Sequence, residues 1–326
     1  MTPGIVRPSL ESLVADTPLS PAIDASIAAT MFPVLDLDAP KSLHYEGSYD
    51  GYQVHNTDHA KPCPRRARRP GPRTGPLDKR VILVAGGSGG IGAETSKRLA
   101  RTEASIVVAD MDGAGAEAVA AEVVAAGGRA VAVRCDITNP TDCEAAAQAA
   151  VDRFGRLTGM VNCAGVSRPH DSLSLPPGDW ARMVDVQLNG AFYLAQSCAR
   201  RMIPGGGAIV FITSTNAEAA FPRRAAYCSA KAGVAMLTKV LAIEWAHYGI
   251  RVNAVGPAYV ATEMTQRNIA AGNVTEAQIK ARIPLGRLAQ PRDVAEAVAY
   301  LLSDQAGFVT GHSLYVDGGW LAYGFF

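Results

Sequence analysis

The chain has 326 residues, 48% of them hydrophobic and 19% charged, with a formal net charge of +1. This composition provides for a sizeable core, and the near-neutral charge gives no reason to expect nucleic acid or an anionic membrane as partner. The six cysteines include no Cys-x-x-Cys pair, which predicts reduced thiols. No apolar run approaches the ~20 residues of a membrane span, and the acidic N-terminus is unlike a signal or transit peptide. We therefore expect a cytoplasmic protein.

Residues 1–77 are predicted to form an N-terminal arm and linker. The first sixty residues carry eight acids against two bases, and residues 61–73 then place six cations among prolines. Such proline spacing favours an extended, solvated linker over a nucleic-acid or lipid site. A short apolar stripe after Ser20-Pro21 indicates one or two short helices, with plain disorder as the equal alternative.

The arm also contains a spacing that is typical of metal ligands. His55, His59 and Cys63 follow one another at four-residue intervals, which would gather them on one helix face. Glycine, asparagine and proline within the same stretch disfavour that helix. We therefore predict no metal site.

From Leu77 onward, short β-branched runs alternate with amphipathic stretches. The predicted strands are Val81–Ala85, Ser105–Ala109, Ala130–Arg134, Gly159–Asn162, Ala208–Thr213, Arg251–Val255 and Ser313–Val316. The predicted helices are Gly90–Arg101, Ala114–Ala126, Pro140–Phe154, Asp179–Met202, Ala225–His247 and Pro291–Ser303. Apolar strands separated by helices predict an α/β domain over residues 78–326: a doubly wound parallel sheet of Rossmann type, in three α/β/α layers, with its ligand crevice at the carboxyl ends of the strands.

A glycine-rich loop follows the first predicted strand and opens the first helix. It reads Gly86-Gly87-Ser88-Gly89-Gly90-Ile91-Gly92, and it fits either Gly-x-Gly-x-x-Gly or Gly-x-x-x-Gly-x-Gly. Glycines allow the backbone to approach a pyrophosphate, which then lies at the positive end of the helix. The loop therefore predicts a phosphate-bearing dinucleotide.

The second strand is followed by Asp110 and Met111. A carboxylate about 20 residues beyond the loop binds the adenosine ribose hydroxyls and repels a 2′-phosphate. No arginine follows it, which favours NAD over NADP. The alternative role of Asp110, as a cap of the next helix, is compatible with either cofactor.

A Tyr-Cys-Ser-Ala-Lys segment, residues 227–231, opens the longest apolar helix. Residues four apart share a helix face, so the Tyr227 phenol and the Lys231 ammonium are expected to point the same way. A tyrosine titrates near ~10, and an ammonium ~4 Å away at an effective dielectric near 20 supplies about 4 kcal/mol toward the phenolate. The spacing alone occurs often by chance, so its meaning depends on the rest of the chain.

Together these motifs resemble the short-chain dehydrogenase/reductase family over residues 78–326. The family's other motifs correspond to Cys135-Asp136-Ile137, Asn162-Cys163-Ala164-Gly165, Ser214 thirteen residues before Tyr227, the 257–262 segment and a closing Asp317-Gly318-Gly319. The resemblance implies Ser214, Tyr227 and Lys231 as catalytic residues. It implies a cofactor site made of Gly86, Ser88, Gly89, Gly90, Ile91, Gly92, Asp110, Met111, Asp136, Ile137, Asn162, Ala164, Gly165, Tyr227, Lys231, Pro257, Val260 and Thr262.

The sequence departs from the family pattern at its fourth catalytic position. In the Val-Gln-Leu-Asn-Gly segment of residues 186–190, Gln187 stands where the family has an asparagine that holds a relay water. Gln187 keeps the amide but adds a methylene. Asn189 could take the place of the relay asparagine only if the helix register shifted.

The resemblance implies hydride transfer between a carbinol carbon and nicotinamide. Tyr227 is expected to exchange the proton, Lys231 to lower the pKa of Tyr227 and bind ribose, and Ser214 to hold the substrate oxygen. A polar lid over residues 261–284 favours a polyol, sugar or related small secondary alcohol as substrate. The alternatives are an NADPH-dependent 3-oxoacyl-thioester ketoreductase and a non-catalytic dinucleotide-binding scaffold or sensor.

Two further expectations concern the surroundings of this site. Ser167, Arg168, Pro169, His170, Asn216 and residues 221–224 are expected at the pocket mouth, where Arg223 and Arg224 either meet an anion or, more commonly, lie exposed or at a subunit interface. By analogy with the family, we expect a homo-oligomer, a tetramer, assembled through Asp179–Met202 and Ala225–His247.

Overall fold

The computed structural model describes Leu77 and residues 79–324. The predicted arm helices, the His55, His59 and Cys63 spacing and the basic run of residues 61–73 lie outside these residues. Leu77, placed by the sequence at the end of the linker, is 1% exposed and packs into the core.

Seven parallel strands form one sheet in the order β3-β2-β1-β4-β5-β6-β7. Their bounds are β1 Val81–Ala85, β2 Ser105–Asp110, β3 Arg129–Arg134, β4 Gly159–Asn162, β5 Gly207–Ile212, β6 Ile250–Pro257 and β7 Ser313–Val316. The order reverses between β1 and β4, which is where a doubly wound sheet opens its ligand crevice.

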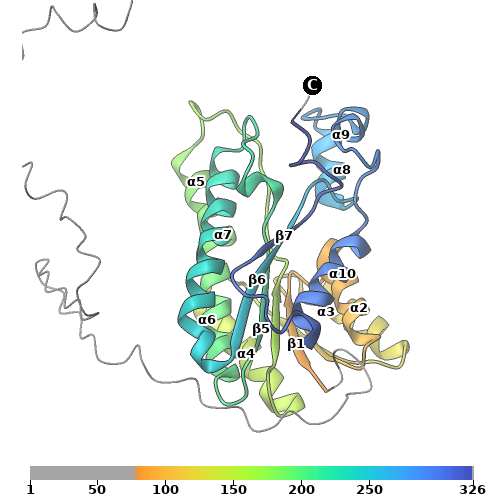
Figure 1. Cartoon of the computed structure of the whole chain (residues 1–326), viewed down its shortest axis with the longest axis vertical. Helices are drawn as coiled ribbons and strands as arrows, with labels where there is room; N and C mark the ends of the chain where they lie inside the picture. The colour runs from red at the N-terminus through yellow and green to blue at the C-terminus, as the bar shows by residue number, and fades with distance from the viewer. Residues whose placement is uncertain (1–76, 78, 325–326) are drawn as a thin grey trace, which may run out of the picture. The chain divides into compact units, whose positions relative to one another are not determined.

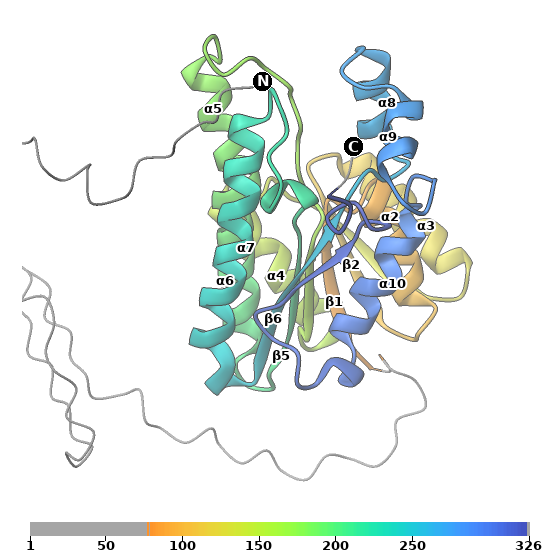
Figure 2. The ribbon, with the colours of Figure 1, turned by 45° about the horizontal axis from the view of Figure 1, so that its top comes forward.

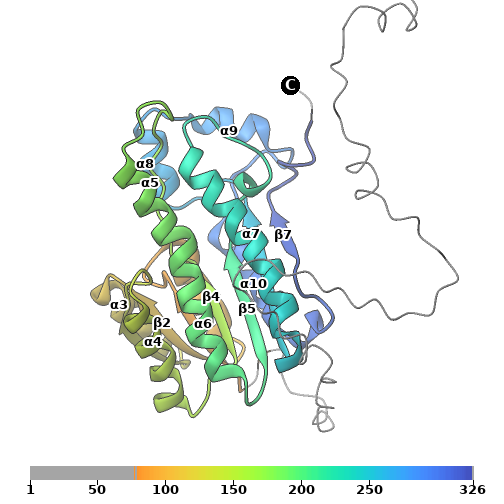
Figure 3. The same ribbon diagram turned by 90° about the vertical axis from the view of Figure 1, so that its left-hand side faces the viewer.

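Helices cover both faces of the sheet (Figures 1 and 3). One layer contains α2 Gly90–Ala100, α3 Gly113–Ala125 and α10 Pro291–Leu302. The other contains α4 Pro140–Phe154, α6 Gly190–Met202 and α7 Ala225–Trp245, with α5 Pro177–Val184 continuing into α6. The predicted three-layer α/β/α architecture is confirmed.

The alternation of side chains along β1 explains the two cores. Val81, Leu83 and Ala85 pack with α4, α6 and α7, whereas Ile82 and Val84 pack with α2, α3 and α10. Successive residues of a strand point to opposite faces. A strand buried on both sides must therefore be apolar at every position, as the sequence pattern indicated.

The predicted elements agree with the observed ones to within one or two residues at most ends. Helix Asp179–Met202 differs: it begins at Pro177, and its middle, Asp185–Asn189, is a π-helical turn between α5 and α6. Such turns interrupt a helix without a proline or glycine and often lie at functional sites. The sequence pattern did not predict this π-helical turn.

Two short helices, α8 Glu263–Ala270 and α9 Glu276–Arg282, lie above the carboxyl ends of the strands (Figure 2). They occupy the predicted lid and have a small core of their own, made of Ile279, Ile283 and Leu288 with Tyr259 and Trp320 packed against it. A Thr275 capping box begins α9. The lid is thus a folded unit placed over the crevice.

By length and composition alone, the segment Ala225–Tyr248 could cross a membrane. Its residues Val234, Leu241 and Ala242 are buried in the core beneath the sheet, however. We therefore interpret α7 as a core helix.

Candidate active site

The glycine loop fits its predicted role because two of its glycines leave no room for a side chain. A Cβ on Gly92 would lie 2.0 Å from the Gly86 carbonyl oxygen, and one on Gly86 would lie 2.5 Å from the Ala164 backbone nitrogen. Gly86 and Gly90 also have positive φ, of 69° and 53°. The backbone of β1, α2 and the segment after β4 therefore closes into one cradle at the start of α2.

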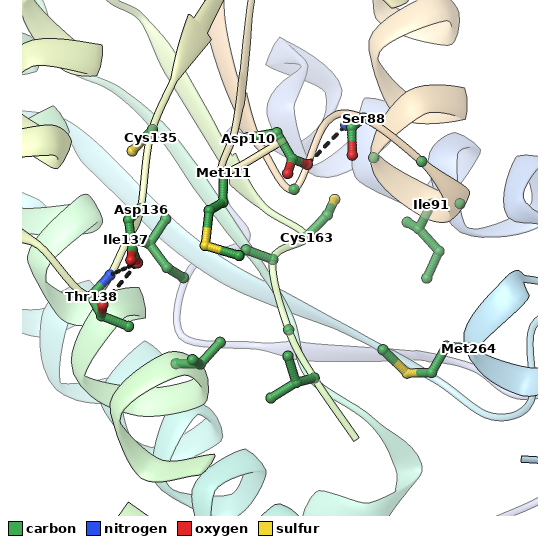
Figure 4. Close-up of a pocket in the computed structure, with 18 of the residues that line it drawn as sticks. Ser88, Ile91, Asp110, Met111, Cys135, Asp136, Ile137, Thr138, Cys163 and Met264 are labelled. Atoms are coloured by element: carbon green, nitrogen blue, oxygen red, sulfur yellow. Dashed lines mark hydrogen bonds between the residues drawn. The ribbon is translucent and has the colours of Figure 1, made fainter. Parts of the chain in front are cut away.

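A cleft of about 620 Å³ opens at this cradle. The Asp110 carboxylate lies in its wall and accepts hydrogen bonds from the backbone N–H of Ser88, at 3.0 Å, and of Asp112, also at 3.0 Å (Figure 4). The cap of α3 is Asp112, whose side chain accepts from Gly115. Asp110 is therefore free of the capping role that the sequence left open, and it faces the cleft beside Met111.

The Asp136 carboxylate lies in the same cleft, just after β3, the strand that neighbours β2 with Asp110 at its end (Figure 4). Its Oδ1 accepts from the Thr138 backbone N–H at 2.9 Å and from the Thr138 hydroxyl at 2.8 Å. These hydrogen bonds lower the pKa of Asp136. The side chain is therefore held ionised in the wall of the cleft.

Most of the predicted cofactor residues are brought together in this cleft. Those that line it are Gly86, Ser88, Gly89, Gly90, Ile91, Gly92, Asp110, Met111, Asp136, Ile137, Ala164, Gly165 and Thr262. Asn162, Tyr227, Lys231, Pro257 and Val260 do not line it. Asn162 supports it from beneath, because its Oδ1 accepts from the Ala164 backbone N–H at 3.1 Å.

The sequence named none of the residues through which α5 and α8 line the cleft, although α8 lies within the predicted lid of residues 261–284. Gly178, Ala181 and Arg182 line the cleft from α5, and Met264 and Arg267 line it from α8. Small residues and arginines on a surface helix carry no motif, so nothing in the sequence distinguished them. Among the residues that the structure describes, no cluster of three or more His, Cys, Asp or Glu side chains is suited to a metal ion.

Ser214 and Tyr227 meet next to this cleft. Ser214 lies two residues beyond the end of β5 and is 9% exposed, and its Oγ accepts from the Asn216 backbone N–H at 3.1 Å. Tyr227 lies in the first turn of α7, where burial raises its pKa and the nearby Ser214 hydroxyl opposes that rise. The predicted serine–tyrosine pair is therefore assembled by the β5–α7 connection.

Lys231 lies one turn further along α7 and is 5% exposed. Its Nζ donates to the Ile212 carbonyl oxygen at 2.7 Å and lies 5.7 Å from the centroid of the Tyr227 ring. Desolvation lowers the pKa of Lys231 to about 8. The shared helix face is thus as predicted, but the expected lowering of the tyrosine pKa is not seen: burial outweighs the Ser214 hydroxyl and the Arg224 charge, and the pKa of Tyr227 is raised.

Gln187 occupies the π-helical turn and is 2% exposed. Its Nε2 donates to the Val166 carbonyl oxygen at 2.6 Å, while its Oε1 is buried without a partner among the described residues. Asn189 instead donates to the Asp185 carboxylate at 2.7 Å. Gln187 rather than Asn189 therefore faces inward, toward the segment that follows β4.

The loops predicted at the pocket mouth do lie together. The His170 backbone N–H donates to the Arg223 carbonyl oxygen at 2.9 Å, which joins the loop after β4 to the loop before α7. The two arginines separate: Arg223 is exposed and donates to Asn273, whereas Arg224 is 6% exposed. The sequence favoured an exposed or interfacial position for both, which is wrong for Arg224.

Comparison with known proteins places this geometry among oxidoreductases. A family model described as enoyl-(acyl carrier protein) reductase matches residues 85–321. The chain is 39% identical over 247 residues to D-threitol dehydrogenase of Mycolicibacterium smegmatis, covering 75% of this chain and 94% of the relative. It is 40% identical over 246 residues to cis-4-hydroxycyclohexanecarboxylate dehydrogenase of Sinomonas cyclohexanicum, covering 75% and 97%.

A solved structure extends the likeness to three dimensions. The structure of 7α-hydroxysteroid dehydrogenase complexed with NADH and 7-oxo glycochenodeoxycholic acid matches with a TM-score of 0.72 at 34% identity. The match covers 74% of this chain and 94% of that one.

Proposed function

The chain belongs to the short-chain dehydrogenase/reductase family, and we propose that it uses NAD to interconvert a small secondary alcohol and its ketone. The observation that carries this proposal is the meeting of Ser214, Tyr227 and Lys231 beside the glycine cradle, at the carboxyl end of the sheet. A polyol, sugar or related small alcohol is the proposed substrate. The activities named for the threitol and hydroxycyclohexanecarboxylate relatives support this class.

The residues of the cleft fit a dinucleotide. The Gly86 and Gly92 cradle admits a pyrophosphate, Asp110 suits ribose hydroxyls and Asp136 suits the adenine. When bound, the dinucleotide supplies or accepts the hydride. Asn162, Pro257 and Val260 are proposed to support the cofactor from behind the lining residues.

The protein's own chemistry is proton transfer at the substrate oxygen. Ser214 donates a hydrogen bond to that oxygen, and Tyr227 takes its proton in oxidation or returns it in reduction. At an effective dielectric near 20, a charge 5.7 Å from the Tyr227 ring is worth about 3 kcal/mol toward the phenolate, which opposes the effect of burial. Lys231, with its pKa of about 8, keeps most of its charge at neutral pH.

The proposed preference for NAD rests on Asp110. Its carboxylate faces the cleft and would repel a 2′-phosphate. We expect Asp110→Asn to lower the ratio of kcat/KM for NAD to that for NADP about tenfold, because the amide keeps an acceptor for Ser88 but loses the charge. A wild-type enzyme that prefers NADP would contradict this assignment.

Two alternatives are separated by activity. A 3-oxoacyl-thioester reductase using NADPH is supported by a relative, the 3-oxoacyl-[acyl-carrier-protein] reductase of a Synechocystis species, which is 36% identical over 250 residues, and it is opposed by Asp110. A non-catalytic scaffold or sensor is opposed by the assembled Ser214, Tyr227 and Lys231. Two assays test all three functions: NADH formation over a panel of polyols, sugars and cyclic alcohols, and NADPH oxidation with 3-oxoacyl thioesters. Turnover in the second assay alone, or in neither assay, would overturn the proposed function.

Assembly and location complete the proposal. On α7, Met236, Val240 and Ile243 are 57%, 41% and 78% exposed and share one face. Exposed apolar side chains in a stripe support burial against another subunit. We propose a cytoplasmic homotetramer built through the α5–α6 and α7 helices, with a catalytic domain over residues 78–326 that follows an arm and linker over residues 1–77, whose last residue, Leu77, packs into the core of the domain.

A further inference from the structure

Arg224 carries a buried positive charge without a counter-ion among the residues that the structure describes. Its side chain is 6% exposed, and no described carboxylate lies within ion-pair distance of it. Desolvation lowers its pKa, while the phenols of Tyr259 and Tyr227 favour the charge. Buried charges are normally paired, because leaving water without a partner is costly.

The guanidinium connects two elements close to Tyr227. It donates through Nη1 to the Ser167 hydroxyl, in the loop after β4, and through Nη2 to Asn268 Oδ1, on α8, at 3.3 Å. A guanidinium has five N–H donors in a planar fork. Two are used by these neutral partners, so three have no partner among the described residues.

Arg224 also stands close to the reacting centre. It is the residue immediately before α7, and Tyr227 follows it three positions later, within reach of its charge. Residues three apart near a helix start lie on neighbouring parts of the same face. The N-terminus of this 21-residue helix adds a further partial positive charge.

We propose that Arg224 binds a carboxylate of the substrate, so that the secondary alcohol oxidised by this enzyme is a hydroxy acid. This rests on the proposed function and adds to it the chemical class of the substrate. The planar fork suits the two oxygens of one carboxylate. A phosphate monoester dianion would call for a second cation, and Arg223, the neighbouring one, is exposed and turned to Asn273.

A matched pair of substrates tests the proposal. We expect kcat/KM with NAD to be at least tenfold higher for 4-hydroxycyclohexanecarboxylate than for 4-hydroxycyclohexanecarboxamide, which has the same shape without the charge. Arg224→Gln should bring this ratio close to one, mainly through KM for the acid, and Arg224→Lys should restore part of it. The control Arg223→Gln should leave the ratio unchanged.

Each other result counts against the proposal. A wild-type ratio near one overturns it without any variant. If Arg224→Gln lowers kcat/KM for the acid and the amide equally, Arg224 has only a structural role, as a link between Ser167 and Asn268, and the proposal is wrong. A stronger preference for a hydroxyalkyl phosphate than for the carboxylate overturns the assignment of the anion. If no alcohol is oxidised, the proposed function fails. Calorimetric binding of the same acid and amide then tests separately whether Arg224 binds a carboxylate, and equal affinity for the two would show that it does not.

Discussion

At Lys231 the proposed catalytic role and stability oppose each other. The proposed mechanism uses the ammonium next to Tyr227, yet this group is 5% exposed and its pKa is lowered from 10.5 to about 8 by desolvation. A group whose folded pKa lies below its unfolded pKa destabilises the native state wherever both states are protonated. Below about pH 8 the full cost of this buried charge is therefore present.

We expect Lys231→Met to abolish measurable turnover and to stabilise the fold at pH 7 by roughly 2 kcal/mol. The lowered pKa corresponds to about 3 kcal/mol, and loss of the hydrogen bond to the Ile212 carbonyl returns about 1 kcal/mol. Between pH 8 and 10.5 the unfolded wild-type chain holds the proton more tightly than the folded one, so wild-type stability rises with pH, and the advantage of the variant is lost and then reversed by the roughly 1 kcal/mol of the missing hydrogen bond.

Urea unfolding of both proteins across this pH range makes the measurement. Lys239→Met, at an exposed position of the same helix, is the control and should change little. A Lys231→Met protein that is less stable than the wild type at pH 7 would contradict the buried-charge account.

Gln187 has a side-chain oxygen for which the described protein atoms provide no partner. Because Oε1 is buried beside Gly165, we propose that it holds a water in the proton relay, in the place of the family's asparagine. Gln187→Met removes the amide at nearly constant volume. Loss of the hydrogen bond to Val166 lowers stability, whereas removal of the buried oxygen without a partner raises it. We therefore expect the unfolding free energy to change by no more than about 1 kcal/mol.

The same variant should lower kcat roughly tenfold or more if the relay passes this oxygen. Steady-state kinetics in deuterium oxide, compared for wild type and variant, make the readout specific to proton transfer. Unchanged kcat and solvent isotope effect would remove Gln187 from the relay and leave it as a support for the Val166 segment.

At the scale of elements, the junction of β1 and α2 depends on Gly92. Its Cβ would lie 2.0 Å from the Gly86 carbonyl oxygen, whereas a Cβ on Gly89 would meet nothing within 4 Å. We expect Gly92→Ala to cost roughly 3 kcal/mol of stability and to weaken dinucleotide binding, because the cradle must open. Gly89→Ala, whose φ of −158° suits any residue, should leave stability within about 0.5 kcal/mol.

Thermal unfolding and NADH titration of the two variants check this contrast. Equal stability of Gly92→Ala and Gly89→Ala would show that the loop relaxes at no cost, and the cradle would then not depend on close backbone contact.

The elements that sequence predicted well are those with a local cause. β1 is apolar at five successive positions because both of its faces are buried, and α4 begins at an Asn139 cap followed by proline. The π-helical turn at Asp185–Asn189 was not predicted, since it has no local sequence signal; the contact that its Gln187 makes is with Val166, in the segment after β4.

The candidate site shows the same division. The glycine loop, Asp110, Ser214, Tyr227 and Lys231 follow from motifs with fixed spacing. The α5 and α8 walls of the cleft, and the burial of Arg224, depend on which loops the fold brings over the crevice. The Arg-Arg sequence alone does not predict which of the two adjacent arginines is buried and which is exposed.

At the scale of the molecule, the exposed stripe on α7 carries the proposed assembly. Ile243→Glu places a charge in its most exposed position and should shift the particle to a smaller mass, because burying an unpaired carboxylate is unfavourable. Light scattering coupled to gel filtration measures this. Val124→Glu, 53% exposed on α3 in the opposite layer, is the control, and a wild-type mass of one subunit would contradict the proposal.

We propose that this cleft and its neighbouring tyrosine catalyse the dinucleotide-linked oxidation of a secondary alcohol. The most direct measurement compares NADH formation by wild type and Tyr227→Phe on the best alcohol of the panel, with NAD binding measured in parallel. We predict that kcat falls roughly a thousandfold while NAD affinity stays within a few-fold, because only the proton-transferring hydroxyl is lost. Turnover by Tyr227→Phe at the wild-type rate would contradict the account.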